Sequence, residues 1–275
     1  MYRLDRNGEN MGNAITIMFT NQKGGVGKTS TCLGLAEAFR YMGRKVLLVD
    51  CDPQANTTSS FQVDTDGIAT LYDLIVNREP IENCIISNGD GIDILPGDKV
   101  LKAQEDMIGP EKITRLQHEL KKVKDVYDYI LIDTNPGTGF CVKASFAAAD
   151  GAIIPLNFEK YAIDGLADVM RTMDSFRDLN EDFKLFGVLI NKLDMRMGDQ
   201  RQANDQFEKM NGQKMGDQIL HVFDTKIRTD QTIPKAQTRD ESIFENYKGS
   251  KAQQDFLALA EEFEEETCYE KSSID

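Results

Sequence analysis

Eight consecutive residues, KGGVGKTS at positions 23–30, have the types and spacing of a phosphate-binding loop. Glycines let a backbone bend around phosphate groups and bring its N–H groups within hydrogen-bonding distance. Lys28 is placed to reach the β- and γ-phosphates of a nucleoside triphosphate, and the hydroxyl of Thr29 is placed to hold Mg²⁺. The stretch therefore predicts a binding site for a magnesium–nucleotide complex.

The flanking segments are those that such a loop requires. An apolar run at 14–20 predicts a buried strand, and apolar residues at helical spacing after the loop predict a helix that ends at Gly43. The partial positive charge of a helix N-terminus attracts phosphate. The residues predicted to contact the nucleotide through this loop are Lys23, Gly24, Gly25, Val26, Gly27, Lys28, Thr29 and Ser30.

Acidic residues follow the second and third predicted core strands. Asp50 and Asp52 follow the second strand, and Asp133 ends the third. Ligands of open α/β sheets bind at the carboxyl ends of strands, so we expect these carboxylates to approach the nucleotide. Asp133 is typical of a Walker B aspartate, which holds Mg²⁺ through a water molecule. Asp52 is placed to meet Mg²⁺ or an attacking water, or it is only the N-cap of a helix that begins at Pro53.

The tetrapeptide NKLD at 191–194 raises the question of the base. In GTPases this pattern reads guanine, because the aspartate accepts hydrogen bonds from two N–H groups that adenine does not offer as a pair. Asp194 would have that role here. Asn191 is the residue that we expect beside the base with either nucleotide, and the tetrapeptide by itself leaves both ATP and GTP open.

The loop departs from the ordinary Walker A pattern. Gln22 stands where glycine is usual, and a second lysine, Lys23, precedes the glycines. This combination resembles the deviant Walker A motif of the ParA/MinD family of dimerising ATPases. The string VDCDPQ at 49–54 resembles the second signature of that family, and Arg196 after the NKLD tetrapeptide also fits its pattern. The resemblance runs from about residue 14 to residue 265 and is nearest to the Soj-like plasmid and chromosome partitioning ATPases.

The resemblance implies an ATPase that uses ATP and Mg²⁺ and forms a homodimer with ATP. It implies that Lys23 reaches across the dimer interface to the phosphates of the partner, and that Asp52 positions the hydrolytic water. With Lys28, these are the catalytic residues. The ATP dimer would bind DNA non-specifically, and a ParB-like centromere-binding protein would stimulate hydrolysis during DNA partitioning. Arg196 and Arg228 best match the DNA-contacting positions of the family.

The third family motif is altered. The usual pattern is D-x-P-P-S, but Asn135 replaces the first proline and Gly137 replaces the serine. These changes leave the expected role of Asp133 intact and affect the loop that would contact the γ-phosphate. Gly137 and Gly139 are expected to give that loop freedom to move.

At least five predicted strands alternate with helices along the 275 residues. This pattern predicts an α/β fold, namely a single-domain P-loop NTPase with a mainly parallel twisted sheet and helices on both faces. We expect residues 1–13 to be a flexible extension with Met11 as an alternative start. The ATPase domain is predicted at 14–265 and an acidic, polar tail at 266–275.

Composition limits the partners. The net charge of −14 opposes general attraction to nucleic acid, so DNA binding would need a local basic patch. The five scattered cysteines lack a CxxC pair and suit a reducing cytosol. There is no visible signal peptide or long apolar run, and the acidic C-terminus would be repelled by anionic lipid. We therefore expect a cytoplasmic, nucleoid-associated protein without a membrane partner.

Three alternatives remain at this level. The first is a cell-division or cargo-positioning ATPase that binds a protein scaffold instead of DNA. The second is an iron–sulfur carrier of the same fold, against which the absence of paired cysteines counts. The third is a tyrosine-kinase relative, which is disfavoured because the tail has only Tyr269.

Overall fold

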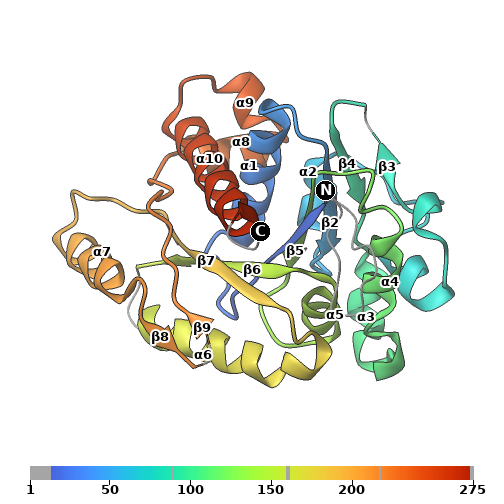
Figure 1. The fold of residues 1–275 in the computed structure, drawn as a ribbon. Coiled ribbons are helices and arrows are strands. Elements are labelled where there is room, and N and C mark those ends of the chain that lie inside the picture. The colour runs from blue at the N-terminus through green and yellow to red at the C-terminus, as the bar shows by residue number, and fades with distance from the viewer. Residues whose placement is uncertain (1–13, 88, 159–161, 217, 273–275) are drawn as a thin grey trace.

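A seven-stranded sheet runs through the centre of the protein (Figure 1). The computed structural model describes residues 14–87, 89–158, 162–216 and 218–272. The strand order is β3-β4-β2-β5-β1-β6-β7, and every neighbouring pair is parallel except β3 and β4. The strands are β1 (Ile15–Phe19), β2 (Val46–Cys51), β3 (Ile86–Ser87), β4 (Ile92–Leu95), β5 (Tyr129–Thr134), β6 (Gly151–Asn157) and β7 (Lys184–Asn191).

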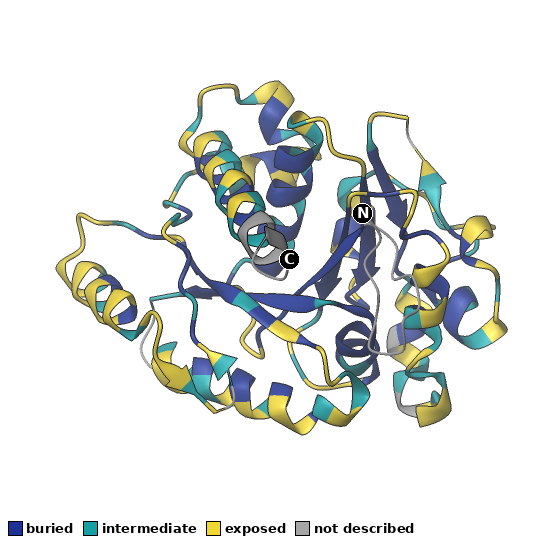
Figure 2. Cartoon of the chain, in the orientation of Figure 1, coloured by how far each residue is buried: buried dark blue, intermediate teal, exposed yellow. Residues whose placement is uncertain are grey.

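Helices cover both faces of this sheet (Figure 1). One face packs against α1 (Lys28–Tyr41), α8 (Thr232–Arg239), α9 (Ile243–Asn246) and α10 (Lys251–Ser272). The other packs against α3 (Lys99–Gln104), α4 (Arg115–Lys121), α5 (Phe140–Ala148), α6 (Ala162–Ser175) and α7 (Gly198–Met210). Figure 2 shows the result, with strands buried between the two layers and exposed residues on the outer sides of the helices. The predicted fold class is therefore confirmed.

Short elements complete the chain. They are α2 (Asn56–Ser60), a π-helix (Asp73–Asn77), the hairpin of β8 (Lys214–Met215) and β9 (Gln218–Ile219), and the 3₁₀ turns Ile81–Asn83, Glu105–Met107, Pro110–Lys112 and Arg177–Leu179. After β9, an isolated parallel bridge joins Val222 to Val188 of β7. None of the described helices has the length and apolar character needed to cross a membrane.

The order of the strands separates two parts of the predicted site. Strand β5 lies between β2 and β1, so the acidic segment after β2 is two strands away from the phosphate loop. Asp133 of β5 is in register with Phe19 of β1 on one side and with Asp50 of β2 on the other. The parallel strands therefore bring the phosphate loop after β1, Asp133 of β5 and the acidic segment after β2 to the same end of the sheet, with Asp133 in the middle.

The end of the chain differs from the predicted domain boundary. Helix α10 continues to Ser272, so no change of structure marks residue 265. The helix is long because Phe256, Leu259 and Phe263 bury one stripe of it against the sheet layer, together with α1. The proposed extension at 1–13 lies outside the described residues.

The contact of α1 with α10 gives a test of the packing. Gly34 of α1 is buried against the ring of Phe256, and a Cβ atom at this position would collide with that ring. We expect Gly34→Ala to lower the free energy of unfolding by about 1–3 kcal/mol, because the buried ring has little room to shift. Chemical denaturation would measure it.

Gly165→Ala is the matched control. Gly165 lies within α6, and, apart from its chain neighbours and the nearby backbone of that helix, no described atom lies within 4 Å of the position that its Cβ would take. Alanine favours a helix, so stability should rise there by up to about 1 kcal/mol. Equal effects of the two substitutions would contradict the packing described for α1 and α10.

Candidate nucleotide-binding site

The glycine-rich segment connects β1 to α1 and has the backbone that only glycine tolerates well. Gly25 and Gly27 have φ angles of 76° and 94°, in the left-handed region. A Cβ atom on Gly27 would also collide with the side-chain amide of Asn191. Helix α1 begins at Lys28, so its N-terminal N–H groups face the concave side of the turn. The segment therefore has the geometry of a phosphate-binding loop.

The two lysines of the loop have different surroundings. Lys28 is buried, and its Nζ donates to the carbonyl oxygens of Asn21 at 3.1 Å and Lys23 at 3.3 Å. Burial lowers the pKa of Lys28, and the nearby carboxylates of Asp133 and Asp52 act in the opposite direction. The side chain of Lys23 is exposed where the chain enters the loop. Lys28 therefore belongs to the interior of this site, whereas Lys23 lies on its outer surface.

Asp133 lies under the loop and is fully buried. Its Oδ2 accepts hydrogen bonds from the hydroxyls of Thr29 at 2.7 Å and Thr57 at 2.8 Å. Its Oδ1 has no hydrogen-bond partner among the described residues. Burial raises the pKa of Asp133 to about 7, the Asp50 carboxylate adds to the shift, and the two hydroxyls oppose it. Carboxylate and hydroxyl oxygens are the ligands that Mg²⁺ prefers, so the paired Thr29 and Asp133 fit the magnesium role predicted for them.

Asp50 holds the segment after β2 in shape. Its carboxylate accepts hydrogen bonds from the backbone N–H of Asp52 and from both the N–H and the hydroxyl of Thr58. Burial raises the pKa of Asp50 to about 6. Because its oxygens are occupied by this segment, Asp50 holds the local structure and does not line the cleft.

Asp52 points into the site, but the helix expected after it begins later. Its Oδ1 accepts from the N–H of Gln54 at 2.8 Å in a local turn. Helix α2 begins at Asn56 after Ala55, whose φ of 54° is left-handed. The prediction that Asp52 caps a helix starting at Pro53 is therefore wrong, because the backbone of Ala55 is left-handed and the helix begins only after it.

A cleft of about 630 Å³ lies over the loop. A volume of this size suits a small organic ligand such as a nucleotide. The cleft brings together part of the predicted site, whereas Lys23, Gly24, Val26, Asp133 and Asn191 are not among the residues that line it. Its lining includes Gly25, Gly27, Lys28, Thr29, Ser30, Asp52, Pro136, Lys192, Gln237 and Asp240.

The segment after β7 supports the loop from behind. Asn191 is 3% exposed, and its Nδ2 donates to the Val26 carbonyl and to the Thr31 hydroxyl, each at 3.1 Å. Contact between Asn191 and a base stays a prediction, since in this structure its amide is bonded to the loop. Lys192, which we did not single out, lines the cleft and donates from Nζ to the Gly25 carbonyl at 2.7 Å. Its position directly after Asn191 in the NKLD tetrapeptide was the available signal.

Both arginines matched to DNA-contacting positions form ion pairs in this structure. Arg196 binds the two carboxylate oxygens of Asp194 at 2.8 and 2.6 Å, and its side chain is 89% exposed. Hydrogen bonds from Arg196 lower the pKa of Asp194 to about 2. Arg228 makes a similar two-point contact with Asp255 of α10. The two arginine loops are neighbours, because a parallel bridge joins Leu193 to Arg228.

Comparison with known proteins agrees with this geometry. A family model described as an AAA domain matches residues 14–185. The sporulation initiation inhibitor protein Soj of Bacillus subtilis is 37% identical over 191 residues, which are 68% of this chain and 75% of that protein. The chromosome partitioning protein ParA of Caulobacter vibrioides is 31% identical over 211 residues, 74% of this chain and 79% of its own. The chain belongs to the ParA family.

A solved structure extends the comparison. The cobyrinic acid a,c-diamide synthase of Mycobacterium smegmatis has a TM-score of 0.75 and 25% identity, over 90% of this chain and 93% of its own. It was solved with ADP and magnesium, and also with an ATP analogue and magnesium. In this ParA-family protein, the loop, Asp52 and Asp133 lie within the 14–185 match, whereas both arginine loops lie beyond it.

The raised pKa of Asp133 predicts how the stability of the nucleotide-free protein changes with pH. A carboxyl group in the unfolded chain ionises near pH 4, roughly, whereas folded Asp133 keeps its proton up to about pH 7. Between these values the folded state binds more protons, so the free energy of unfolding falls as pH rises. Asp133→Asn removes this cost, and at about pH 8 we expect it to raise that free energy by roughly 1–3 kcal/mol.

Urea unfolding at about pH 5 and about pH 8 would measure this effect. Asp125→Asn, a substitution at an exposed aspartate, is the control and should leave the difference between the two pH values unchanged. An Asp133→Asn protein that loses as much stability as the wild type over this range would contradict the assignment to Asp133.

Proposed function

We propose that this protein is an ATP-dependent dimerising switch for DNA partitioning. In this proposal the ATP dimer binds DNA without sequence preference, and a ParB-like centromere-binding protein stimulates hydrolysis and so releases the dimer. The observation that carries the proposal is the placement of the two loop lysines. Lys28 is buried and donates to carbonyl oxygens of its own loop, while Lys23 is exposed where the chain enters the loop.

The chemistry follows from the residues that line the cleft. Phosphoryl transfer requires neutralised charge and in-line placement of water more than it requires a covalent nucleophile. Lys28 and the loop N–H groups would hold the phosphates, and Thr29 with Asp133 would hold Mg²⁺, the latter through water. Mg²⁺, when bound, offsets negative charge on the phosphate oxygens. Asp52, at the wall of the same cleft, would orient the attacking water.

Two observations favour ATP over GTP. The carboxylate of Asp194, which would have to accept the guanine N–H groups, is bound on both oxygens by Arg196. The synthase with the related fold holds ADP in one structure and an ATP analogue in another. GTP would require Arg196 to release Asp194 first.

Dimerisation by Lys23 can be tested with one substitution. We expect Lys23→Ala to bind ATP with nearly the affinity of the wild type but to stay monomeric, because the cation that would reach the partner subunit is lost. Light scattering with ATP and Mg²⁺ measures the mass in solution. Lys28→Ala is the comparison and should lose ATP binding itself, since its amine lies inside the loop. ATP-dependent dimers of Lys23→Ala would overturn the role across the interface.

The proposed DNA surface, which consists of Arg196 and Arg228, is connected to the cleft through the backbone and through hydrogen bonds. The segment that runs from Asn191 and Lys192, beneath and beside the loop, leads directly to Arg196. Leu193 then pairs with the segment of Arg228, and the N–H of Thr229 donates to the Leu193 carbonyl at 2.9 Å. Both arginines would bind phosphates of the DNA backbone, which gives affinity without sequence preference.

We expect Arg196→Ala to weaken ATP-dependent binding of random-sequence DNA and to reduce the slope of log affinity against log salt by about 1. Fluorescence anisotropy at several salt concentrations would measure both quantities. Arg171→Ala is the matched control, because Arg171 is also highly exposed and pairs with a nearby aspartate, Asp168, but lies on α6. Equal effects of the two substitutions would remove Arg196 from the DNA surface.

A second function is favoured by the charges. The chain carries a net charge of −14, and both candidate arginines are paired with carboxylates. These features suit a positioning ATPase that binds a protein scaffold through the same arginine loops. In that case ATP would still drive dimerisation, but neither arginine substitution would change DNA retention. The DNA-partitioning function places the protein in the cytoplasm on the nucleoid, and the scaffold function places it with its cargo.

A further inference from the structure

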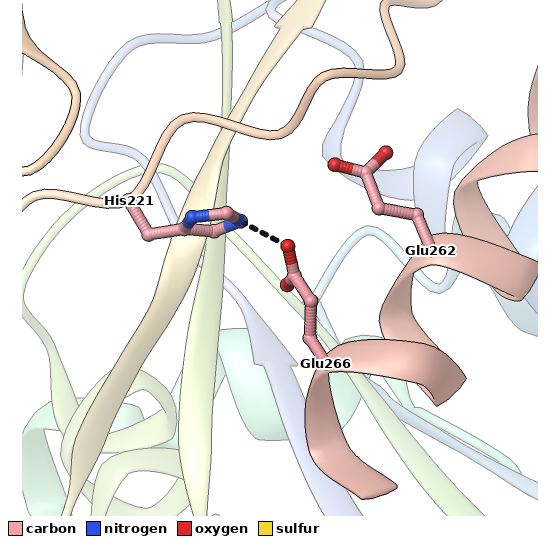
Figure 3. A group of neighbouring side chains, drawn as sticks. All are labelled: His221, Glu262 and Glu266. Atoms are coloured by element: carbon pink, nitrogen blue, oxygen red, sulfur yellow. Dashed lines mark ion pairs between the residues drawn. The ribbon is translucent and has the colours of Figure 1, made fainter. Parts of the chain in front are cut away.

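The side chains of one histidine and two glutamates converge at a place that shares no residue with the nucleotide cleft. His221 lies in the extended segment that pairs with the edge of β7, where the N–H of Val188 donates to the His221 carbonyl. Glu262 and Glu266 are one turn apart on α10, so both face this segment (Figure 3). The three side chains are half-buried between the sheet edge and the helix.

The ligand atoms of these residues converge. One nitrogen of His221 and one carboxylate oxygen from each glutamate all lie within 4.8 Å of one another. Nε2 of His221 is shielded from solvent and lies 3.0 Å from Oε1 of Glu266, yet it makes no hydrogen bond of standard geometry among the described residues. Figure 3 shows the imidazole ring directed at Glu266, with Glu262 on the same side of the helix.

We propose that His221, Glu262 and Glu266 bind a divalent cation, and that Zn²⁺ is the ion that this donor set fits best. One imidazole and two carboxylates are ordinary zinc ligands, and three protein ligands leave a fourth position for water. Mg²⁺ prefers oxygen ligands only, so the imidazole argues against it. In a tetrahedral zinc site the ligand atoms are about 3.4 Å apart, which small rotations of these half-exposed side chains would achieve.

Negative charges surround His221 and would attract a cation. Asp224 adds a third carboxylate near His221, and its backbone N–H donates to Glu262. Lys226 donates its Nζ to the carbonyl oxygens of Phe223 and Asp224. Glu262 also accepts the N–H of Thr225 at 2.8 Å, and hydrogen bonds of this kind orient the ligands of metal sites.

A bound ion would join two elements that the sequence separates by about forty residues. It would fasten α10 to the segment that leads to Arg228, the residue that α10 also holds through Asp255. Zinc should therefore raise the thermal stability of the protein, because it binds a site that exists only when α10 is docked.

The test is a titration of the full chain with Zn²⁺ after treatment with a chelator. It uses excess Mg²⁺ to occupy oxygen-only sites, and a chromophoric chelator as competitor. All proteins carry Cys268→Ser, so that this thiol near the site in sequence does not bind the probe. We expect one tight zinc per chain. Glu266→Gln and His221→Asn should each weaken it at least about tenfold, since even outer contacts of metal sites are worth that much.

His118→Asn is the matched control, because His118 is the other histidine of the chain and lies on α4. It should bind zinc as the parent protein does. Glu266→Gln changes a half-exposed side chain, and its folding can be verified by its melting temperature without metal. Zinc should raise the melting temperature of the parent but not of Glu266→Gln. The proposal is overturned if the parent binds no zinc, or if Glu266→Gln and His221→Asn bind it as tightly as the parent.

Discussion

Two carboxylates buried side by side at one edge of the sheet set the conditions for the whole site. Asp133 and Asp50 are in register on adjacent strands, and both are inaccessible to solvent. Burial disfavours their ionised forms and raises the pKa of both; the Asp50 carboxylate adds to the shift of Asp133, and the Asp52 carboxylate adds to that of Asp50. Hydrogen-bond donors oppose this effect. The hydroxyls of Thr29 and Thr57 donate to Asp133, and the N–H and hydroxyl of Thr58 donate to Asp50.

The donors differ in a way that matters for function. Those on Asp50 come from its own segment after β2, and they fix that segment. Those on Asp133 come from the loop and from α2, so this carboxylate ties together the two segments that bound the cleft. A cation bound beside Thr29 would favour the ionised form of Asp133, and the cost of burying that charge would fall. Nucleotide binding and local stability are therefore expected to be coupled through this residue.

The segment after β7 is the second structural link. It supports the loop through Asn191 and Lys192, and it pairs with the segment of Arg228 through Leu193. Arg228 is held in turn by Asp255 of α10. A rearrangement of the loop would thus alter the contacts of both arginine loops and of α10. This continuity is the physical basis for expecting the nucleotide to control a surface outside the cleft.

Local patterns in the sequence were sufficient for the fold class, and they singled out the loop and the acidic residues of the candidate site. The glycines of the loop are constrained by backbone geometry over a few residues, and Asp52 follows, and Asp133 lies near the end of, a strand of plainly apolar character. What the sequence did not reveal depends on partners far away along the chain. The insertion of β5 between β1 and β2 is a property of sheet order, and the pairing of Arg228 with Asp255 arises only when α10 packs.

Asn191 illustrates the same limit. The NKLD tetrapeptide singled out Asn191, but not the direction of its amide, because that direction depends on the space that Gly27 leaves by having no Cβ atom. The backbone of Ala55 is left-handed, and α2 therefore begins only at Asn56. The residue types around Ala55 do not predict this conformation.

The proposed function requires a nucleotide to switch this protein between a state that binds DNA and one that does not. The most direct measurement is retention of random-sequence DNA at low salt by the wild-type protein, with no nucleotide, ADP, ATP or GTP in parallel. We expect retention with ATP alone. Retention that is equal in all four conditions, or absent in all four while ATP still produces dimers, would contradict it.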